Sequence, residues 1–315
     1  MNENQDTYLV TGGAGFIGSN IVKELLKRGQ RVRVLDNFAT GKRENLIPFK
    51  ENAHFELIEG DLRSFHTVRT AVKGSRYVLH QGALPSVPRS VEDPLTTNDV
   101  NILGTLNILE AAKEFGIKRV VYASSSSIYG DSETLPKDEA MAVDPLSPYA
   151  LSKYTAERYC QIFFRIYDLE TVCLRYFNVF GPNQDPTSQY SAVIPKFIRL
   201  IGAGKSPTIY GDGSQSRDFT HVSNVVAANL SACTAAGAAG QVFNIACGER
   251  FTLIQLVETI NRLSGTKIEP VFAGTRTGDV KHSLADITKA QEGLGFNVVA
   301  RFEQGLADLI KRMIV

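Results

Sequence analysis

Three glycines between a strand-like run and a helix-like run limit most strongly what this chain can fold into. Gly12, Gly15 and Gly18 follow the apolar segment 8–11 and precede the amphipathic segment 16–28. Glycine permits a tight turn, lets backbone amides approach a ligand and allows the helix to pack close to the strand. The helix N-terminus adds a partial positive charge that favours phosphate. The spacing therefore predicts the first unit of a dinucleotide-binding fold.

Strand-like apolar runs alternate with helix-length amphipathic segments along the chain. Strands are predicted at 8–11, 32–36, 55–58, 77–80, 120–124, 172–176 and 242–246, and helices at 16–28, 65–72 and 97–115. Such alternation is typical of a parallel sheet with helices on both faces. We therefore expect an α/β fold with a Rossmann-type, doubly wound parallel sheet.

The same pattern predicts two regions. Residues 1–180 form the expected Rossmann domain, to which parts of 215–250 return, and residues 181–315 form a smaller, interleaved α/β substrate lobe rich in turns. In that lobe Thr252 and Gln255 are spaced as a capping box that opens a helix.

An acidic residue at the end of the second predicted strand indicates the cofactor. Asp36 stands 18 positions after Gly18, where a carboxylate can accept hydrogen bonds from an adenosine ribose and would repel a 2′-phosphate. NAD is therefore favoured over NADP, although Lys42 and Arg43 nearby weaken the preference. Asp61 follows the third strand and is interpreted either as an acceptor for an adenine amino group or as a helix cap.

Composition excludes several function classes. The net charge of +1, from 34 basic and 33 acidic residues, predicts no nucleic-acid partner and no anionic membrane surface. The four cysteines form no C-x-x-C pair, which is typical of a reduced cytoplasm. No apolar run approaches the roughly 20 residues of a membrane span. The histidines lack ligand spacing, so no metal is expected, and His80 in an apolar strand is interpreted as a core residue.

The pair Tyr149 and Lys153 indicates acid–base chemistry. Residues four apart share one helix face, so the lysine ammonium can favour the ionised form of the phenol. An unperturbed phenol, with a pKa of about 10, would be an inefficient base at neutral pH. The serine run 124–127 ends the fifth predicted strand at the carboxyl edge of the sheet, where such folds bind ligands, and is a candidate proton relay.

Taken together, these motifs carry a resemblance. The segments 11–18, 61–62, 124–130, 147–153, 175–178 and 217–219 resemble the extended short-chain dehydrogenase/reductase family of nucleotide-sugar enzymes over nearly the whole chain. Within it, the chain is most similar to UDP-hexose 4-epimerases, and especially to the branch that acts on UDP-N-acetylglucosamine.

The resemblance implies roles for individual residues. Tyr149 would be the base, Lys153 would lower its pKa and hold the nicotinamide ribose, and Ser125, assisted by Ser126, would hydrogen-bond the reacting sugar hydroxyl. The residues implied to bind NAD are Gly12, Gly15, Phe16, Ile17, Gly18, Asp36, Asn37, Phe38, Thr40, Gly41, Asp61, Leu62, Gln81, Ala83, Tyr149, Lys153 and Tyr176.

The substrate implied by the resemblance is a UDP-sugar. Its diphosphate would be bound by Asn178, Arg217 and Arg276, since guanidinium groups suit phosphate oxygens. The uridine would meet Asp279, Thr208 and Tyr210. The remaining implied contacts are Val193, Ser86, which would touch the hexose, and Ser283, whose small side chain at a size-gating position leaves room for an N-acetyl group.

Competing chemistries are separated by the residues before Tyr129. Related 4,6-dehydratases place an Asp-Glu pair, and UDP-glucuronate decarboxylases a glutamate, where this chain has Ser126 and Ser127. The expected reaction is therefore oxidation at C4 followed by re-reduction, which is a 4-epimerisation. UDP-glucuronate 4-epimerisation, decarboxylation or dehydration, and a non-catalytic NAD-binding sensor, remain alternatives. The resemblance also implies a homodimer through helices 97–115 and 149–167, with an apolar seam that includes Leu103, Leu106, Ile162 and Ile166.

Overall fold

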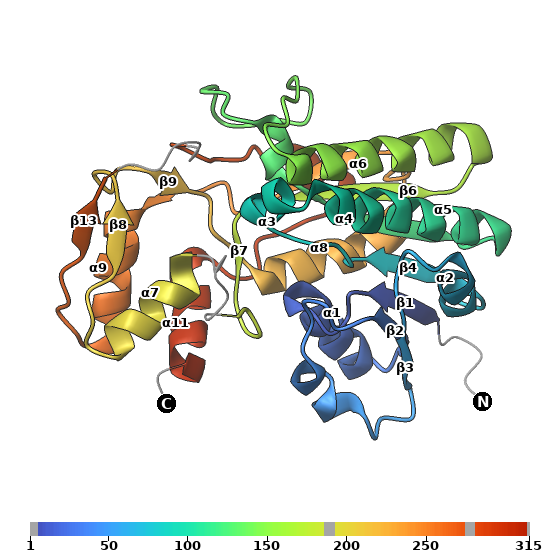
Figure 1. The fold of residues 1–315 in the computed structure, drawn as a ribbon, viewed down its shortest axis with the longest axis horizontal. Helices are drawn as coiled ribbons and strands as arrows, with labels where there is room; N and C mark the ends of the chain where they lie inside the picture. The colour runs from blue at the N-terminus through green and yellow to red at the C-terminus, as the bar shows by residue number, and fades with distance from the viewer. Residues whose placement is uncertain (1–5, 186–192, 275–280, 314–315) are drawn as a thin grey trace.

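A seven-stranded parallel sheet forms the centre of the larger region. The computed structural model describes residues 6–185, 193–274 and 281–313. The sheet order is β11-β6-β5-β4-β1-β2-β3 (Figure 1). The strands span Thr7–Thr11 (β1), Arg31–Asp36 (β2), Phe55–Glu59 (β3), Tyr77–His80 (β4), Arg119–Ser125 (β5), Thr171–Tyr176 (β6) and Val242–Ile245 (β11). The predicted Rossmann-type α/β fold is confirmed.

Helices cover both faces of this sheet, as a doubly wound fold requires. They are α1 (Phe16–Lys27), α2 (Phe65–Val72), α3 (Val87–Glu92), α4 (Pro94–Asn98), α5 (Gly104–Glu114), α6 (Pro148–Tyr167), α8 (Val222–Thr234) and α10 (Thr288–Leu294), with short helical turns at Arg43–Asn45 (η1), Ile47–Phe49 (η2), Asp99–Leu103 (η3) and Ser126–Tyr129 (η4).

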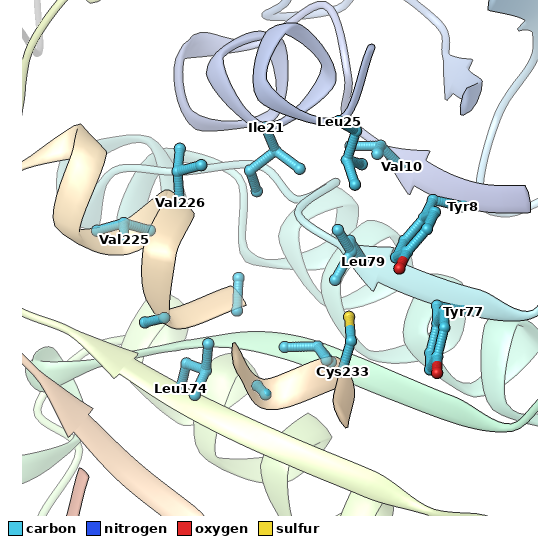
Figure 2. Close-up of a cluster of buried hydrophobic side chains, with 14 of the residues drawn as sticks. Tyr8, Val10, Ile21, Leu25, Tyr77, Leu79, Leu174, Val225, Val226 and Cys233 are labelled. Carbon is cyan, nitrogen blue, oxygen red and sulfur yellow. The ribbon is translucent and has the colours of Figure 1, made fainter. Parts of the chain in front are cut away.

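The two faces of the sheet bury separate apolar clusters because successive side chains of a strand point to opposite faces. Val10 and Leu79 pack with Ile21 and Leu25 of α1 and with α8 (Figure 2). Their strand neighbours, such as Leu9, pack instead against α2, α5 and α6. Continuous burial on both faces explains why these strands are apolar throughout rather than alternating.

A smaller lobe follows β6 and lies to one side of the sheet, drawn at the left of Figure 1. It consists of β7 (Val179–Phe180), α7 (Val193–Gly202), β8 (Thr208–Tyr210), β9 (Ser216–Arg217), β10 (Thr220–His221), β12 (Phe251–Thr252), α9 (Leu253–Ser264), β13 (Val271–Ala273) and α11 (Phe302–Met313). Its own core is centred on Phe302, which stacks on Phe251 at 4.2 Å and on Phe219 at 5.5 Å between ring centroids.

The chain crosses between the two regions more than once. After the lobe's β10, α8 and β11 return to the larger region, where β11 pairs with β6. The chain then re-enters the lobe at β12. The capping box predicted at Thr252 and Gln255 is present at the start of α9.

The predicted helix 97–115 is present and contains a π-helical turn that the sequence did not predict. It is divided into α4, the π-helical turn η3 and α5. Within the turn, the buried side chain of Asn101 accepts a hydrogen bond from Leu84 N at 2.7 Å and donates to Leu84 O and to Ser152 Oγ. These bonds tie the turn both to the segment after β4 and to α6. π-turns of this kind often occur near functional sites.

Candidate functional site

A cleft of about 330 Å³ opens at the carboxyl ends of β1, β2, β4 and β5. This is the edge where the strand order reverses between β1 and β4, and open α/β sheets bind ligands there. Of the residues predicted for NAD, the cleft walls contain Gly12, Gly15, Phe16, Ile17, Gly18, Asp36, Asn37, Thr40, Asp61, Leu62, Gln81, Ala83, Tyr149, Lys153 and Tyr176.

The glycine-rich loop has no room for side chains. A Cβ at Gly12, whose φ is +66°, would lie 2.7 Å from Gly82 Cα, and a Cβ at Gly18 would overlap the carbonyl oxygen of Gly12. The loop therefore brings backbone close to the cleft at the start of α1, which suits a pyrophosphate.

Asp36 lies at the end of β2 and holds the same loop. Its buried carboxylate accepts hydrogen bonds from Ala14 N at 2.9 Å and from Phe38 N at 2.8 Å. Burial raises the pKa of Asp36, and these two amides oppose the shift. The nearby cations are directed to other acids, since Lys42 pairs with Asp185 at 3.0 Å and Arg43 with Glu59 at 2.6 Å.

Two residues predicted to bind NAD, Phe38 and Gly41, are not in the cleft wall and lie next to Asp36 instead. The backbone amide of Phe38 donates a hydrogen bond to Asp36. The guanidinium carbon of Arg43 lies 3.9 Å from the centroid of the Phe38 ring. A Cβ at Gly41 would lie 2.9 Å from Ala14 Cβ and 3.1 Å from Asp36 Oδ1. Both residues therefore pack next to the Asp36 carboxylate.

Asp61 does not cap the following helix, so that interpretation was wrong. Ser64 is the N-cap of α2, with its side chain accepting from Thr67 N. Asp61 instead pairs with Arg63 at 2.7 Å and accepts from Asn37 Nδ2 at 3.0 Å. The hydrogen bonds from Arg63 lower the pKa of Asp61 to about 2. Both Asp61 and Asn37 remain in the cleft wall.

The end of β5 meets the first turns of α6 at the far wall of the cleft. Ser147 caps α6 by accepting from Ala150 N, and Pro148 is the first helical residue, so the helix begins immediately before Tyr149. Ser125, whose hydroxyl lies 2.9 Å from that of Ser127, lowers the pKa of Tyr149. Lys153, one turn further along, donates from Nζ to Ala123 O at 2.8 Å.

Two groups near Tyr149 bear on the ionisation of its phenol. Burial raises the pKa of Tyr149, and hydrogen bonding to Ser125 lowers it. Lys153 donates to the Ala123 carbonyl, and burial lowers the pKa of Lys153 to about 8. The role of Lys153 in lowering the pKa of Tyr149 stays a prediction.

His80 is the core residue that its apolar strand predicted. It is buried between the hydroxyls of Thr11, 2.7 Å from Nδ1, and Thr105, 3.0 Å from Nε2. Burial lowers its pKa to about 3, so the ring is neutral.

A second cavity, of about 300 Å³, lies in the smaller lobe. The predicted substrate residues in its wall are Asn178, Val193, Thr208, Tyr210 and Arg217. The two cavities are neighbours in the fold because Tyr176, at the end of β6, lines the first and Asn178 lines the second. An elongated ligand can therefore place one end in each.

Five further substrate predictions have different outcomes. Ser283 lies next to the second cavity, with its Oγ 3.5 Å from Asn178 Nδ2. Ser86 is the N-cap of α3 and accepts from Arg89 N at 3.4 Å, and Ser126 begins the turn η4. Arg276 and Asp279 lie outside the described residues.

Several wall residues were missed by sequence reasoning. In the first cleft these include Leu84, Pro85, Thr96 and Val100, and in the second they include Lys196, Phe197 and Gln215. Lys196 and Phe197 follow Val193 by three and four positions on α7. Helical periodicity applied to Val193 would have found both. Leu84 and Pro85 follow no motif and no period.

Among the described residues, no group of three or more His, Cys, Asp or Glu side chains is arranged to hold a metal ion. Over the same part of the chain, no helix is both long enough and apolar enough to cross a bilayer. The four cysteines are free and buried.

A Rossmann sheet with a glycine cradle, an acidic residue at the end of β2 and a Ser-Tyr-Lys group at the cleft defines a dinucleotide-dependent enzyme of the α/β class. Residues 8–246 match the family described as "NAD dependent epimerase/dehydratase family". The chain belongs to this family, and NAD is its cofactor.

Relatives over nearly the full length carry three different substrate names. One is the structure of UDP-N-acetylglucosamine 4-epimerase from Methanobrevibacter ruminantium M1 in complex with UDP-N-acetylmuramic acid (41% identity, TM-score 0.94, covering 98% of each chain). Another is UDP-glucose 4-epimerase from Thermus thermophilus in complex with NAD (36%, TM-score 0.88, 98% of each). A UDP-glucuronate 4-epimerase from Thermodesulfobacterium geofontis is 35% identical over 308 residues, covering 95% of this chain and 93% of the relative.

Proposed function

We propose that the substrates of this NAD-dependent UDP-sugar 4-epimerase are UDP-N-acetylglucosamine and UDP-N-acetylgalactosamine. The observation that carries the proposal is that Tyr149 and Lys153 line the dinucleotide cleft next to the end of β5, which carries Ser125. The second cavity begins two residues beyond Tyr176. A sugar joined to a nucleotide in that cavity would present a ring carbon to the tyrosine.

In the proposed reaction, Tyr149 takes the proton from the sugar's 4-hydroxyl, and Ser125 hydrogen-bonds the same oxygen. Bound NAD supplies a reversible acceptor for the C4 hydride. Lys153 would hold the nicotinamide ribose and add positive charge near the phenolate. The sugar then turns its other face, the hydride returns to C4 from that face, Tyr149 returns the proton to the oxygen, and C4 is inverted. Lys153 is buried and Tyr149 is partly buried, which limits the access of water to both groups.

The residues for elimination chemistry are replaced by hydroxyls. Ser127 Oγ lies 2.9 Å from Ser125 Oγ, and Ser126 stands between them. Neither side chain can supply the acid–base pair that dehydration needs or the carboxylate associated with decarboxylation. This composition favours epimerisation over both alternatives.

The choice of an acetamido sugar rests on size and on similarity. Ser283 is small and lies within reach of Asn178, which leaves space for an N-acetyl group at this position. The N-acetylglucosamine epimerase relative is also the one with 41% identity. Space alone does not require an acetyl group, so the sugar must be measured.

The nucleotide half would occupy the second cavity. Its described wall holds two cations, Lys196 and Arg217, and no carboxylate. Such a wall suits a diphosphate. Tyr210 and Thr208 would meet the uracil, and Arg276 and Asp279 complete the proposed set.

The proposal is tested by incubating the purified enzyme with UDP-N-acetylglucosamine, UDP-glucose and UDP-glucuronate, and resolving each 4-epimer by chromatography. We expect the highest kcat/KM for the acetamido sugar. Tyr149→Phe should lose at least about 100-fold in kcat, as expected for removal of a general base. Tyr159→Phe, on the same helix and packed against the core, is the matched control and should retain activity.

Two results would contradict this assignment. If kcat/KM is higher for UDP-glucuronate than for UDP-N-acetylglucosamine, the enzyme is instead a UDP-glucuronate 4-epimerase. Release of carbon dioxide, or formation of a 6-deoxy product, would replace epimerisation by decarboxylation or dehydration.

We also propose a homodimer through α4, α5 and α6, which lie side by side on one surface (Figure 1). Leu95 is 78% exposed and Ile166 is 65% exposed, and Leu103, Leu151 and Ile162 are exposed between them. Leu106 is instead packed against the core. An apolar surface of this kind, continuous over adjacent helices, suits an identical surface on a second copy. Ile166→Glu should convert the dimer to a monomer in sedimentation experiments, and an unchanged mass would refute the interface.

A further inference from the structure

Two consecutive residues of β5 are each bonded to one of two residues spaced four apart on α6. Lys153 donates to Ala123 O at 2.8 Å. Ser124 Oγ donates to Glu157 Oε2 at 2.6 Å. The next residue of the strand is Ser125, which lowers the pKa of Tyr149. Because residues 149, 153 and 157 share one helix face, a ladder of two polar contacts joins the strand end that carries Ser125 to the helix that carries Tyr149.

The second contact, through Glu157, is anchored to the next strand. Arg175 binds Glu157 by two hydrogen bonds, Nη2 to Oε1 at 2.7 Å and Nε to Oε2 at 3.1 Å. Ser124 and Arg175 are register partners on β5 and β6, so both reach the carboxylate from the sheet. All three side chains are buried.

The anchor continues across the sheet to β11. Arg175 Nη1 donates to Tyr129 OH at 2.7 Å, and Tyr129 OH donates to Asn244 Oδ1 at 2.7 Å. Asn244 Nδ2 in turn donates to Lys137 O at 2.9 Å. The carboxylate of Glu157 is thus fixed in place by groups from β6, η4 and β11, none of which touches the proposed reacting atoms.

We infer that Glu157, held by Arg175, is a positioning residue that sets the place of Ser125 beside Tyr149 through its bond to Ser124. This inference rests on the proposed function, because it assigns Ser125 and Tyr149 to proton transfer. Arg175 holds the Glu157 carboxylate in a buried ion pair. Because the carboxylate is held there, the Ser124 hydroxyl that donates to it is also fixed. Its neighbour Ser125 is the residue that lowers the pKa of Tyr149.

The inference predicts an effect on the phenol itself. If the Ser124–Glu157 bond is lost, α6 is held against the end of β5 by one polar contact fewer, and Ser125 shifts relative to Tyr149. The pKa of Tyr149 should then rise. A rise of about one unit corresponds to tenfold less phenolate at a given pH.

The test compares Ser124→Ala with a control that removes another polar contact between β6 and α6. Thr171 Oγ1 donates to Cys160 O at 2.7 Å in a buried position beyond Glu157, so Thr171→Val changes the helix–strand packing without touching the ladder. Glu157→Gln is the second test variant. Tyr149 is titrated in each protein by the tyrosinate absorbance difference against the corresponding Tyr149→Phe variant, and kcat, KM and bound NAD are measured in parallel.

For Ser124→Ala we expect about a tenfold loss of kcat, KM within twofold of the native value, unchanged NAD content and an upward shift of about one unit in the Tyr149 titration. Thr171→Val should lower the melting temperature and leave both the titration and kcat unchanged. A native titration curve and kcat in Ser124→Ala would overturn the inference, as would an equal titration shift in Thr171→Val.

The titration separates this inference from the proposed function. If the native protein converts no UDP-sugar, the proposed function fails, and the absorbance difference still decides whether Glu157 and Ser124 set the Tyr149 pKa. If Glu157→Gln fails to fold, Ser124→Ala decides alone, since it removes only one hydroxyl.

Discussion

Replacing Gly18 by alanine tests the cofactor cradle most severely. A Cβ at this position would overlap the carbonyl oxygen of Gly12 and lie 2.8 Å from the Gly12 carbonyl carbon and from Gly13 Cα. All three atoms are backbone, so no side chain can rotate away. Either the glycine-rich loop or the first turn of α1 must move.

The size of the effect follows from this geometry. Ordinary van der Waals contact with a Cβ begins at 3.4 Å, so the Gly12 carbonyl oxygen and the Cβ must move apart by more than an ångström. Overpacking of this kind costs about 1–3 kcal/mol. If the cost is borne by the NAD-binding conformation of the loop, affinity for NAD falls about 5- to 150-fold. If it is borne by the fold, the melting temperature falls by roughly 2–10 °C.

The assay measures NAD released from purified protein on denaturation, together with the melting temperature with and without added NAD. Gly274→Ala is the matched control, because a Cβ there would meet nothing within 4 Å. We expect Gly18→Ala to lose NAD or melting temperature as above and Gly274→Ala to lose neither. A Gly18→Ala protein with native NAD content and native melting temperature would refute the close approach of α1 to the loop.

Further predictions concern pH, cofactor choice and the smaller lobe. Burial lowers the pKa of Lys153 to about 8 from the 10.5 of a free side chain, so the ammonium is present below pH 8 and lost above it. We therefore expect kcat/KM to fall above about pH 8. A pH profile that stays flat to pH 10 would contradict this. Because the unfolded chain keeps that proton up to pH 10.5, the contribution of Lys153 to the free energy of unfolding should rise with pH between 8 and 10.5, relative to Lys153→Met. Asp36→Ala leaves the amides of Ala14 and Phe38 without their acceptor and should weaken NAD binding about tenfold or more in a fluorescence titration, with a smaller effect on NADP. Phe302→Ala removes the ring stacked on Phe251 and Phe219 and should destabilise the protein by about 3–5 kcal/mol, seen as a lower midpoint of thermal unfolding, whereas an unchanged midpoint would contradict the central place of Phe302 in the lobe.

The fold was predictable because its strands are buried on both faces. Such strands appear in the sequence as short apolar runs bounded by turns, and each predicted sheet strand is present with its bounds within two residues. The π-helical turn within the predicted helix 97–115 was not predictable. It depends on Asn101, whose hydrogen bonds to Leu84 and Ser152 join segments distant in sequence.

The position of a site residue was predictable where a motif fixes the backbone. The hydrogen-bond partner of a side chain was less predictable where several acceptors are within its reach. The glycine loop, Asp36 and Tyr149 all lie at one cleft. The orientation of Lys153 toward Ala123 O, and the cap of α2 by Ser64 rather than Asp61, depend on which acceptor is nearest in three dimensions. The link from Ser124 to Glu157 and Arg175 likewise becomes visible only when β5, α6 and β6 are assembled.

The central claim is that C4 of the sugar is oxidised and re-reduced beside Tyr149, with the same hydrogen returned to carbon. The most direct measurement follows UDP-N-acetylglucosamine deuterated at C4 through turnover in ordinary water, with the product analysed by mass spectrometry and NMR. The account predicts that deuterium remains at C4 of the inverted product. An inverted product in which C4 carries solvent hydrogen would contradict it.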